Sequence, residues 1–395
     1  MNILYLSTVF PESSDTSTIY TDLAEELAKE HKIYVVTNAE KKRNKETYIC
    51  QERGCTVLRV KTGNQYNVGF VEKGITIIML GFLFRKAIRK YFSRKKFDLI
   101  LYETPPITLY GVVKFAKKKY HAHCFLMLKD IFPQNGVDLG IIRKNGFIYW
   151  YFRKLEKKIY QVSDTIGCMS KGNIDYIKAH NTIEDNKLIL FPNTKRIKNH
   201  QQRNINILSK YHIPQNKIRF IFGGNMGRPQ GVRFLAKCIY ACKDIPDAFF
   251  LLIGRGTEKE MVRSMLTGCE NSLVIDELPR NDYEELLIQC DVGIVSLAYD
   301  FTIPNYPSRI LSYMEFGIPT LAMTDTVTDF KELIEAANCG IWIPSNSEEK
   351  FRESIQMLLD KEKRKVMGAN GKKYLQEHFS VLKSVDIINR IMDNS

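Results

Sequence analysis

With 395 residues and a hydrophobic content of 44%, the chain is long enough for two globular domains. It contains no uninterrupted apolar stretch of about 18 residues, which excludes an ordinary membrane-spanning helix. The start, Met1–Leu6, reads as a short buried strand and not as a signal peptide, so we expect a cytoplasmic protein. Nine scattered cysteines without a CxxC pair are typical of reduced, buried thiols.

The net charge of +14 is unevenly distributed along the chain. Residues 1–205 hold 35 Lys+Arg against 19 Asp+Glu, whereas residues 206–395 hold 23 against 25. The whole positive excess therefore lies in the first half. A basic surface attracts nucleic acid, anionic membrane or acidic ligands. No nucleic-acid-binding signature accompanies it, so we do not expect a nucleic-acid partner.

The first half alternates short apolar strands with amphipathic helices, which predicts a parallel sheet. We expect helices at Thr18–Lys29 and Phe147–Tyr160. The expected strands are Ile3–Ser7, Ile33–Thr37, Val57–Val60, Leu99–Tyr102, Cys124–Leu128 and Thr165–Met169.

Residues 75–96 join an apolar run, 75–84, to a dense basic cluster. The cluster consists of Arg85, Lys86, Arg89, Lys90, Arg94, Lys95 and Lys96. An apolar face beside clustered cations is typical of a helix that lies on an anionic bilayer. The alternative is a buried domain helix with a solvated basic end. We predict peripheral binding at the inner face of the plasma membrane through this window.

The polar stretch Lys195–Asn206 reads as a linker, and the second half repeats the α/β pattern. The expected strands are Phe220–Phe222, Phe249–Ile253, Leu273–Ile275, Val292–Val295, Thr320–Ala322 and Gly340–Ile343. Ligands of open α/β sheets bind beyond the carboxyl ends of the strands. Functional residues are therefore expected in the segments that follow these strands.

One such segment, Phe220–Gly231, is the most informative in the chain. Its apolar strand runs into Gly223 and Gly224, and a helical pattern begins at Val232. This layout presents backbone N–H groups and a helix N-terminus to an anion. Arg228, inside the turn, can add a bidentate phosphate contact.

A second segment, Asn305–Pro319, reads as a loop, a short helix and a Gly-Ile-Pro turn into a strand. Together the two segments resemble the donor half of family 4 glycosyltransferases, which have the two-domain GT-B fold. Weaker echoes of the family are Phe191-Pro192-Asn193, Leu252–Gly256, Cys290–Ile294 and Leu128–Pro133, the last resembling a bacterial polysaccharide branch of the family.

The resemblance implies an α/β protein with two Rossmann-like parallel-sheet domains that face a central cleft. Residues 1–200 would bind the acceptor and 206–374 the nucleotide-sugar donor, and a C-terminal helix, about 375–395, would cross back to the first domain.

A nucleotide-sugar donor leaves negative charge on its diphosphate, and no two aspartates here are two apart as in a metal-binding Asp-x-Asp pair. We therefore expect no metal and no other cofactor, and fixed cations and amides in their place. The predicted donor-binding residues are Gly224, Asn225, Gly227, Arg228, Gln230, Gly254, Arg255, Ser308, Arg309, Ser312 and Glu315, with Arg228 and Arg309 also assigned catalytic roles.

The chain departs from the family's pattern at three positions. Gln230 replaces the usual lysine before the final glycine of the loop, and Pro304 and Ser312 replace the paired glutamates. Ser312 can still accept a hydrogen bond from the ribose, and Glu315, one helical turn on, is an alternative.

On the acceptor side, relatives place a histidine where this chain has Lys129-Asp130. A carboxylate at Asp130 could orient the acceptor hydroxyl or stabilise positive charge on the sugar, and could equally cap a loop. Lys129 could contact a phosphate or pair with Asp130. Ser14 and Thr104 complete the predicted acceptor side, and the hydroxyls of residues 13–16 could also cap the following helix.

The resulting hypothesis is a retaining, metal-independent hexosyl- or N-acetylhexosaminyltransferase. It would move a sugar from a nucleotide diphosphate sugar, UDP-linked by preference, to a saccharide on a polyprenyl diphosphate in capsule, O-antigen or exopolysaccharide synthesis. A sugar-nucleotide 2-epimerase of the same fold and a non-catalytic nucleotide- or membrane-binding module remain alternatives.

Overall fold

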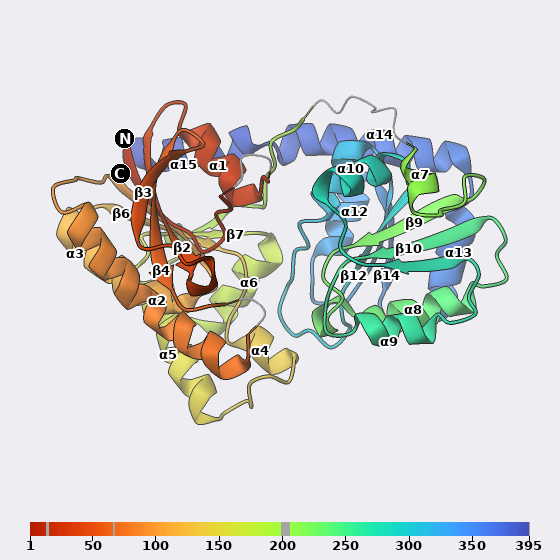
Figure 1. Cartoon of the computed structure of the whole chain (residues 1–395), viewed down its shortest axis with the longest axis horizontal. Helices are drawn as coiled ribbons and strands as arrows, with labels where there is room; N and C mark the ends of the chain where they lie inside the picture. Colours follow the sequence, from red (N-terminus) through yellow and green to blue (C-terminus); the bar gives the residue numbers. More distant parts are fainter. Residues whose placement is uncertain (13–15, 66–67, 199–205, 395) are drawn as a thin grey trace. The chain divides into compact units, whose positions relative to one another are not determined.

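The chain forms two compact units in the computed structural model, which describes residues 1–12, 16–65, 68–198 and 206–394 (Figure 1). Unit 1 consists of Met1–Arg196 together with Ser380–Ser395, and unit 2 of Ile197–Phe379. The sequence predicts these divisions at residues 200, 206 and about 375.

Unit 1 is built on an eight-stranded sheet. In spatial order its strands are β3 (Tyr48–Glu52), β4 (Cys55–Thr62), β2 (Lys32–Glu40), β1 (Asn2–Leu6), β5 (Leu99–Thr104), β6 (His123–Leu128), β7 (Thr165–Cys168) and β8 (Leu188–Leu190). All neighbours are parallel except β3 and β4. The purely parallel sheet expected from the sequence is therefore wrong at this edge.

Strand β3 escapes sequence analysis because it is an edge strand. Its residues alternate between half-buried and exposed, so it lacks the continuous apolar run of a strand covered on both faces. It joins β4 through Arg53 and Gly54, both with positive φ, in the left-handed conformation of a tight hairpin turn.

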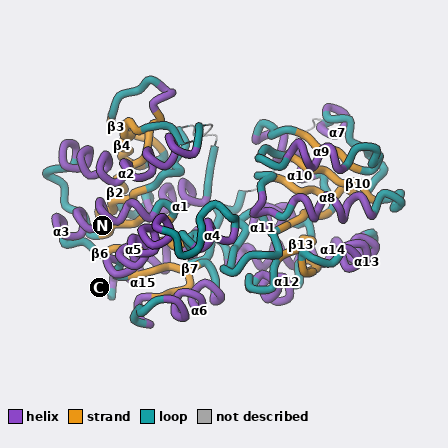
Figure 2. Tube along the Cα trace, turned by 90° about the horizontal axis from the view of Figure 1, so that it is seen from below, coloured by secondary structure: helices purple, strands orange, loops and turns teal. Residues whose placement is uncertain are grey.

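Helices flank the strands of each sheet (Figure 2). Those of unit 1 are α1 (Ile19–Leu27), α2 (Phe70–Tyr91), α3 (Tyr110–Tyr120), α4 (Gln134–Asp138), α5 (Phe147–Val162), α6 (Lys171–His180) and α15 (Val381–Asp393), with short 3-10 turns η1 (Lys41–Arg43), η2 (Ile107–Leu109) and η3 (Asp185–Lys187). Thr18 caps α1 in a reciprocal arrangement with Thr21, so the cap lies beyond the expected residues 13–16.

Unit 2 contains a six-stranded sheet whose neighbours are all parallel. Its strands, in spatial order, are β11 (Ser272–Ile275), β10 (Ala248–Ile253), β9 (Ile218–Gly223), β12 (Val292–Ser296), β13 (Thr320–Thr324) and β14 (Gly340–Pro344). Its helices are α7 (Ile207–Lys210), α8 (Val232–Ala241), α9 (Lys259–Met265), α10 (Arg280–Ile288), α11 (Ile310–Phe316), α12 (Phe330–Ala337), α13 (Glu348–Leu358) and α14 (Lys361–His378), with the 3-10 turn η4 (Arg228–Gln230).

Strand β9 shows why the second half reads as continuous apolar runs. Phe220 and Phe222 belong to the hydrophobic core on one side of the sheet, and Ile221 to the core on the other. A strand covered on both faces has no solvent-exposed side, so apolar and polar residues do not alternate along it.

The order of the strands reverses once in each sheet, between β1 and β5 in unit 1 and between β9 and β12 in unit 2. At such a point the loops leaving two neighbouring strands run in opposite directions and open a crevice at the carboxyl edge. Ser7 and Glu103 lie at this edge in unit 1, and the glycine-rich segment that follows β9 lies at it in unit 2.

The end of the chain returns to unit 1, as expected. Ser380 forms a β-bridge with Lys195, and Thr194 and Ser384 share a hydrogen bond of 2.7 Å between their hydroxyls. Helix α15 then packs against α1, and its apolar residues enter the core of unit 1. No helix in the described ranges combines the length and the apolarity needed to cross a bilayer.

Because α15 completes that core, Ile388→Ala should destabilise unit 1. Ile388 is fully buried, and removing a buried isoleucine side chain of this kind typically costs about 2–5 kcal/mol. Leu382→Ala, on the exposed face of the same helix, is the matched control and should change stability little. Thermal unfolding followed by circular dichroism measures both, and equal effects would contradict this packing.

Candidate functional site

In unit 2, three loops meet at the carboxyl edge of the sheet. The loop after β9 bonds to the loop after β10 through Gly224 N–H to the carbonyl of Ile253 (2.9 Å) and Met226 N–H to the carbonyl of Arg255 (2.7 Å). It also accepts a bond at the Pro229 carbonyl from the N–H of Ala298, which follows β12 (3.0 Å). These backbone bonds make the three loops one surface.

Close contact between the loops explains the predicted Gly254 and its neighbour Gly256. A Cβ on Gly254 would lie 1.8 Å from the carbonyl oxygen of Gly224, and one on Gly256 would lie 2.3 Å from that of Met226. Both glycines also have φ near +151°, which other residues rarely adopt. Because these glycines lack side chains, the backbones of the two loops can come into direct contact. Gly254 therefore contributes to the site by allowing this packing.

The same bonds reduce the number of backbone N–H groups that residues 223–231 can offer to an anion. The N–H groups of Gly224 and Met226 are used between loops, and those of Gln230 and Gly231 close a local turn onto Gly227 and Arg228. Gly224 is left with a structural role: its φ of +132° turns the chain, and its missing side chain leaves room beside Arg309.

Arg309 is the cation that the loop encloses. Its guanidinium lies 4.5 Å from the centre of the Phe222 ring, and its Nη2 donates to Oε1 of Gln230. A Cβ at Gly224 would come within 3.4 Å of the same Nη2. Nη1 is buried without a hydrogen-bond partner. Burial lowers the pKa of the guanidinium, which nevertheless remains charged at neutral pH.

In the part of the chain that the structure describes, no ion pair joins Arg309 to a carboxylate. A buried cation without an acidic partner is costly, and an anionic ligand removes that cost. The flat guanidinium with an unused N–H edge matches a phosphate geometrically. This arrangement can therefore bind a phosphate group at the switch point of the sheet.

The other predicted donor residues are distributed around this cation. Gln230 contacts it directly, and Arg228 opens η4 from an exposed position. Asn225 and Ser308 are exposed, Gly227 is buried, and Ser312 is half-buried. Arg255 points to solvent in an ion pair with Glu277 (3.2 Å), in which both side chains are more than half exposed.

Glu315 is engaged elsewhere. It is 4% exposed, and its Oε1 accepts the backbone N–H of Lys198 at 3.1 Å. The carboxylate thus fixes the start of the linker to α11, which argues against the alternative role of holding a ribose. Its contribution is to hold the helix that begins just after Arg309.

In unit 1, the switch point holds a buried carboxylate, Glu103, directly after the predicted strand Leu99–Tyr102. Glu103 Oε1 accepts the hydroxyl of Ser7 and the N–H of Thr8, each at 2.8 Å, so it fixes the loop after β1. Burial raises the pKa of Glu103 to about 7. The sequence signal that could have identified Glu103 is its acidic side chain near the end of an otherwise apolar strand. A buried carboxylate needs hydrogen-bond partners inside the protein.

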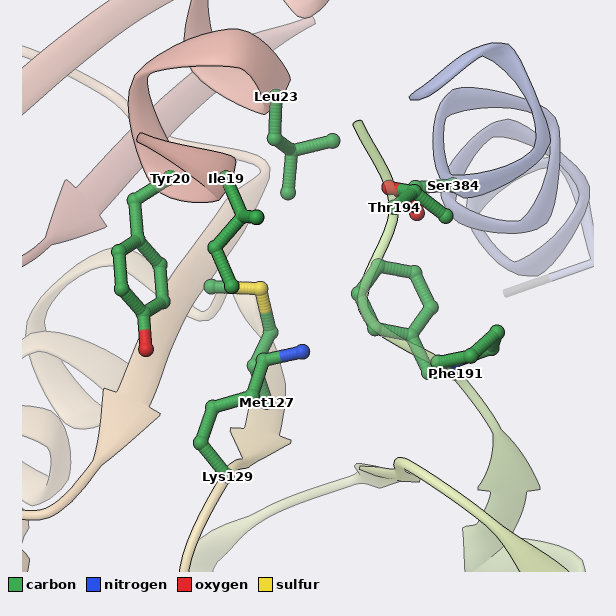
Figure 3. Close-up of a pocket in the computed structure, with 9 residues that line it drawn as sticks. Ile19, Tyr20, Leu23, Met127, Lys129, Phe191, Thr194 and Ser384 are labelled. Atoms are coloured by element: carbon green, nitrogen blue, oxygen red, sulfur yellow. Dashed lines mark hydrogen bonds between the residues drawn. The ribbon is translucent and has the colours of Figure 1, made fainter. Parts of the chain in front are cut away.

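The side chain of Lys129 points into unit 1 and not toward Asp130. Its amine enters a small pocket beside the Phe191 ring, 5.5 Å from the ring centre (Figure 3). Burial lowers its pKa to about 8. The suggested pairing with Asp130 is wrong, because no ion pair joins the two in the described structure. A phosphate contact by Lys129 stays a prediction. The pocket is also lined by Ile19, Tyr20, Leu23, Met127, Pro192, Thr194 and Ser384.

Asp130 is placed by the backbone. The carbonyl of Thr104 accepts the N–H groups of both Lys129 (3.2 Å) and Asp130 (3.3 Å), which ties the two strand ends together. Burial raises the pKa of Asp130 to about 6. The side chain of Thr104 is fully buried, and its carbonyl positions Asp130; a contact between Thr104 and an acceptor stays a prediction. Ser14 lies outside the described residues.

Comparison with known proteins adds a family match within this geometry. Residues 204–374 match the family described as Glycosyl transferases group 1. The chain is 23% identical over 280 residues to the probable glycosyltransferase WbjE of Pseudomonas aeruginosa, covering 70% of this chain and 69% of that protein.

Solved structures share the fold over the whole chain. Sucrose-phosphate synthase from Thermosynechococcus elongatus superposes with a TM-score of 0.77 at 15% identity, and covers 100% of both chains. The Anabaena protein Alr3699/HepE in complex with UDP gives 0.70 at 15% identity, again over 100% of both. The predicted α/β fold of the GT-B type and the coarse assignment to glycosyltransferases are confirmed. Donor, acceptor, stereochemistry and pathway stay predictions.

The pKa of Asp130 leads to a test of its role. A carboxyl whose pKa is raised on folding stabilises the fold when protonated, and this stability is lost as the pH rises from about 4 through 6. Asp130→Asn should therefore unfold at a higher temperature than the wild type at pH 7.5, and the difference should vanish near pH 4.

The same substitution should lower glycosyl transfer by roughly 100-fold or more if Asp130 acts on the acceptor. Asp175→Asn, on the exposed face of α6, is the control and should alter neither property. An Asp130→Asn protein that is stabilised but fully active would remove Asp130 from the chemistry.

Proposed function

We propose that this protein is a metal-independent, retaining glycosyltransferase that uses a UDP-sugar and acts on a lipid-linked saccharide. The observation that carries the proposal is the guanidinium of Arg309 at the switch point of unit 2, whose Nη1 is buried and which pairs with no carboxylate in the described part of the chain. Retention is proposed from the resemblance to family 4. UDP is favoured because the similar Anabaena protein was solved with UDP.

In the proposed reaction, the bond between the sugar and the diphosphate breaks, and negative charge accumulates on the departing diphosphate. Arg309 would meet this charge with its unused N–H edge, and Gln230 would hold the guanidinium in place. Exposed Arg228, at the start of η4, would add a second cation. Because these groups are fixed before the reaction, they need little reorganisation to stabilise the transition state.

Asp130 would orient the acceptor hydroxyl or stabilise positive charge on the sugar. With a pKa of about 6, it is mostly ionised at neutral pH and can accept a proton. Its position is set by the carbonyl of Thr104.

A lipid-linked acceptor at an anionic membrane surface is supported by helix α2. Its outer face exposes Ile75, Ile78, Met79 and Phe82, and the following turns expose Arg85, Lys86, Arg89 and Lys90. The opposite face, with Leu80, Phe84 and Ile88, is fully buried in unit 1. A buried domain helix and a membrane-facing helix are therefore compatible alternatives for α2: one face packs inside, and the other offers an apolar and basic surface. Capsule, O-antigen or exopolysaccharide synthesis is the pathway we propose.

Arg309→Met should abolish most donor binding. UDP should raise the melting temperature of the wild type, GDP should do so less, and the variant should bind UDP roughly 10- to 100-fold more weakly. Without ligand, the variant should be at least as stable as the wild type, since a buried unpaired charge has been removed. Arg233→Ala, exposed on α8, is the matched control and should respond to UDP normally. An Arg309→Met protein with an undiminished response would refute the proposed phosphate site.

Turnover of UDP-sugars with a lipid diphosphate acceptor should continue unchanged in excess EDTA, because Arg309 and Arg228 replace a divalent cation. Loss of activity that Mg²⁺ or Mn²⁺ restores would show that the charge on the diphosphate is met by a metal. Incubation with UDP-GlcNAc alone should leave the sugar unepimerised.

A further inference from the structure

A second apolar surface in unit 1 lies apart from the residues used so far. It is formed by residues 139–151, which we call the aromatic arm. They link α4 to the first turns of α5. Ile141, Phe147, Ile148 and Trp150 each expose 59–80% of their surface. Large apolar side chains this exposed, and this close together, are unusual on a monomeric protein and mark an interaction surface.

The arm is held outward by its own packing. The carbonyl of Gly136 accepts the N–H groups of both Ile141 and Ile142, at 2.9 Å each, which folds the chain back on α4. Ile142 is buried, while Ile141 beside it points out. Phe152 meets the ring of Phe132 edge to face, 5.0 Å between centres, and fixes the start of α5. The exposed residues are therefore presented by a built structure.

The arm and α2 belong to one side of unit 1. Both α2 and α5 pack against η2, and Figure 1 draws the two helices next to each other at the same end of the unit. The hydroxyl of Thr108 in η2 donates to the carbonyl of Ile77 in α2 (2.7 Å), which fixes this packing. The exposed apolar residues of the arm and of α2 thus lie on neighbouring elements.

The charges around these residues identify the occupant. Residues 73–97 contain no acidic residue. Residues 139–161 contain only Glu156, which is buried and paired with Arg153 at 2.5 Å. Arg143, Lys144, Lys154 and Lys157 are exposed around the arm. Protein interfaces are depleted in lysine, whereas an apolar centre with Trp and Tyr and a basic rim matches the interface of an anionic bilayer.

We propose that the aromatic arm inserts into the anionic membrane together with α2, and that it anchors the part of the chain that carries Asp130. Asp130 and the arm belong to the single connection between β6 and α5, and Phe132, two residues from Asp130, contacts Phe152 at the base of the arm. Docking of the arm would therefore hold Asp130 at a fixed depth relative to a lipid-linked acceptor. This inference rests on the proposed acceptor class, but the membrane contact can be tested without it.

Trp150 provides a direct readout, because the chain has only two tryptophans. Trp342 is the other; it belongs to unit 2 and donates to the hydroxyl of Thr324 at 2.9 Å. In the Trp342→Phe protein, vesicles of phosphatidylglycerol and phosphatidylethanolamine should shift the emission to shorter wavelength, and brominated lipids should quench it. The Trp150→Phe protein, in which only Trp342 emits, is the control and should show neither effect.

Vesicle sedimentation tests how much the arm contributes. Phe147→Asn combined with Ile148→Asn should weaken binding to these vesicles at least tenfold, because two apolar side chains no longer enter the bilayer. Met357→Asn, an exposed apolar residue on α13, is the control and should bind as the wild type does. The UDP-induced thermal shift should persist in all these proteins, which shows that they fold.

The outcomes separate the arm from the rest of the proposal. If replacing Arg85, Lys86, Arg89 and Lys90 by Gln releases the protein but the arm variant binds normally, the arm is not an anchor, whereas the membrane surface of α2 remains. If Trp150 emission does not respond and no variant changes sedimentation, the membrane contact is refuted, while the UDP result still decides the donor site. Concentration-dependent dimers that the arm variant abolishes, without vesicle binding, would identify a second copy as the occupant and overturn the inference.

Discussion

Unit 2 is organised around one electrostatic constraint: the guanidinium of Arg309 has a buried Nη1 and no carboxylate among the described residues to neutralise it. Arg309 is supported by the Phe222 ring and by Gln230, and the turn at Gly224 leaves it room. The glycines of the neighbouring loops have a separate purpose, since they allow backbone segments to lie in contact and keep three loops in register. The proposed anion site therefore depends on the packing beneath it as much as on the charge itself.

Much of the fold follows from sequence patterns because buried parallel strands have a strong signal. The six strands of unit 2 appear as separate apolar runs, since residues such as Phe220 and Ile221 feed the cores on opposite faces. The edge hairpin of β3 and β4 lacks that signal, because β3 is only half-buried and its partner is fixed by a two-residue turn. Local pattern also could not show the return of α15 into unit 1, which was inferred from resemblance.

The sequence predicted which segments form the candidate site better than it predicted the directions of their side chains. The segments after the strands were found because parallel strands end at one edge, which is a property of the fold. Whether a side chain turns inward or outward there depends on packing that no motif encodes. Lys129 turns into a pocket beside Phe191, Glu315 bonds to the linker, and Thr104 contributes its carbonyl. Glu103 is not among the predicted site residues for the same reason: its partners, Ser7 and Thr8, are far away in sequence.

The bridge between Lys195 and Ser380 joins two parts of unit 1 that are far apart in the sequence. Unit 1 is discontinuous, because Met1–Arg196 and Ser380–Ser395 belong to it, whereas the residues between them form unit 2. Its core includes apolar side chains of α15. Met1–Arg196 alone therefore leaves part of that core uncovered, and unit 1 can be completed only after the residues of unit 2 have been synthesised.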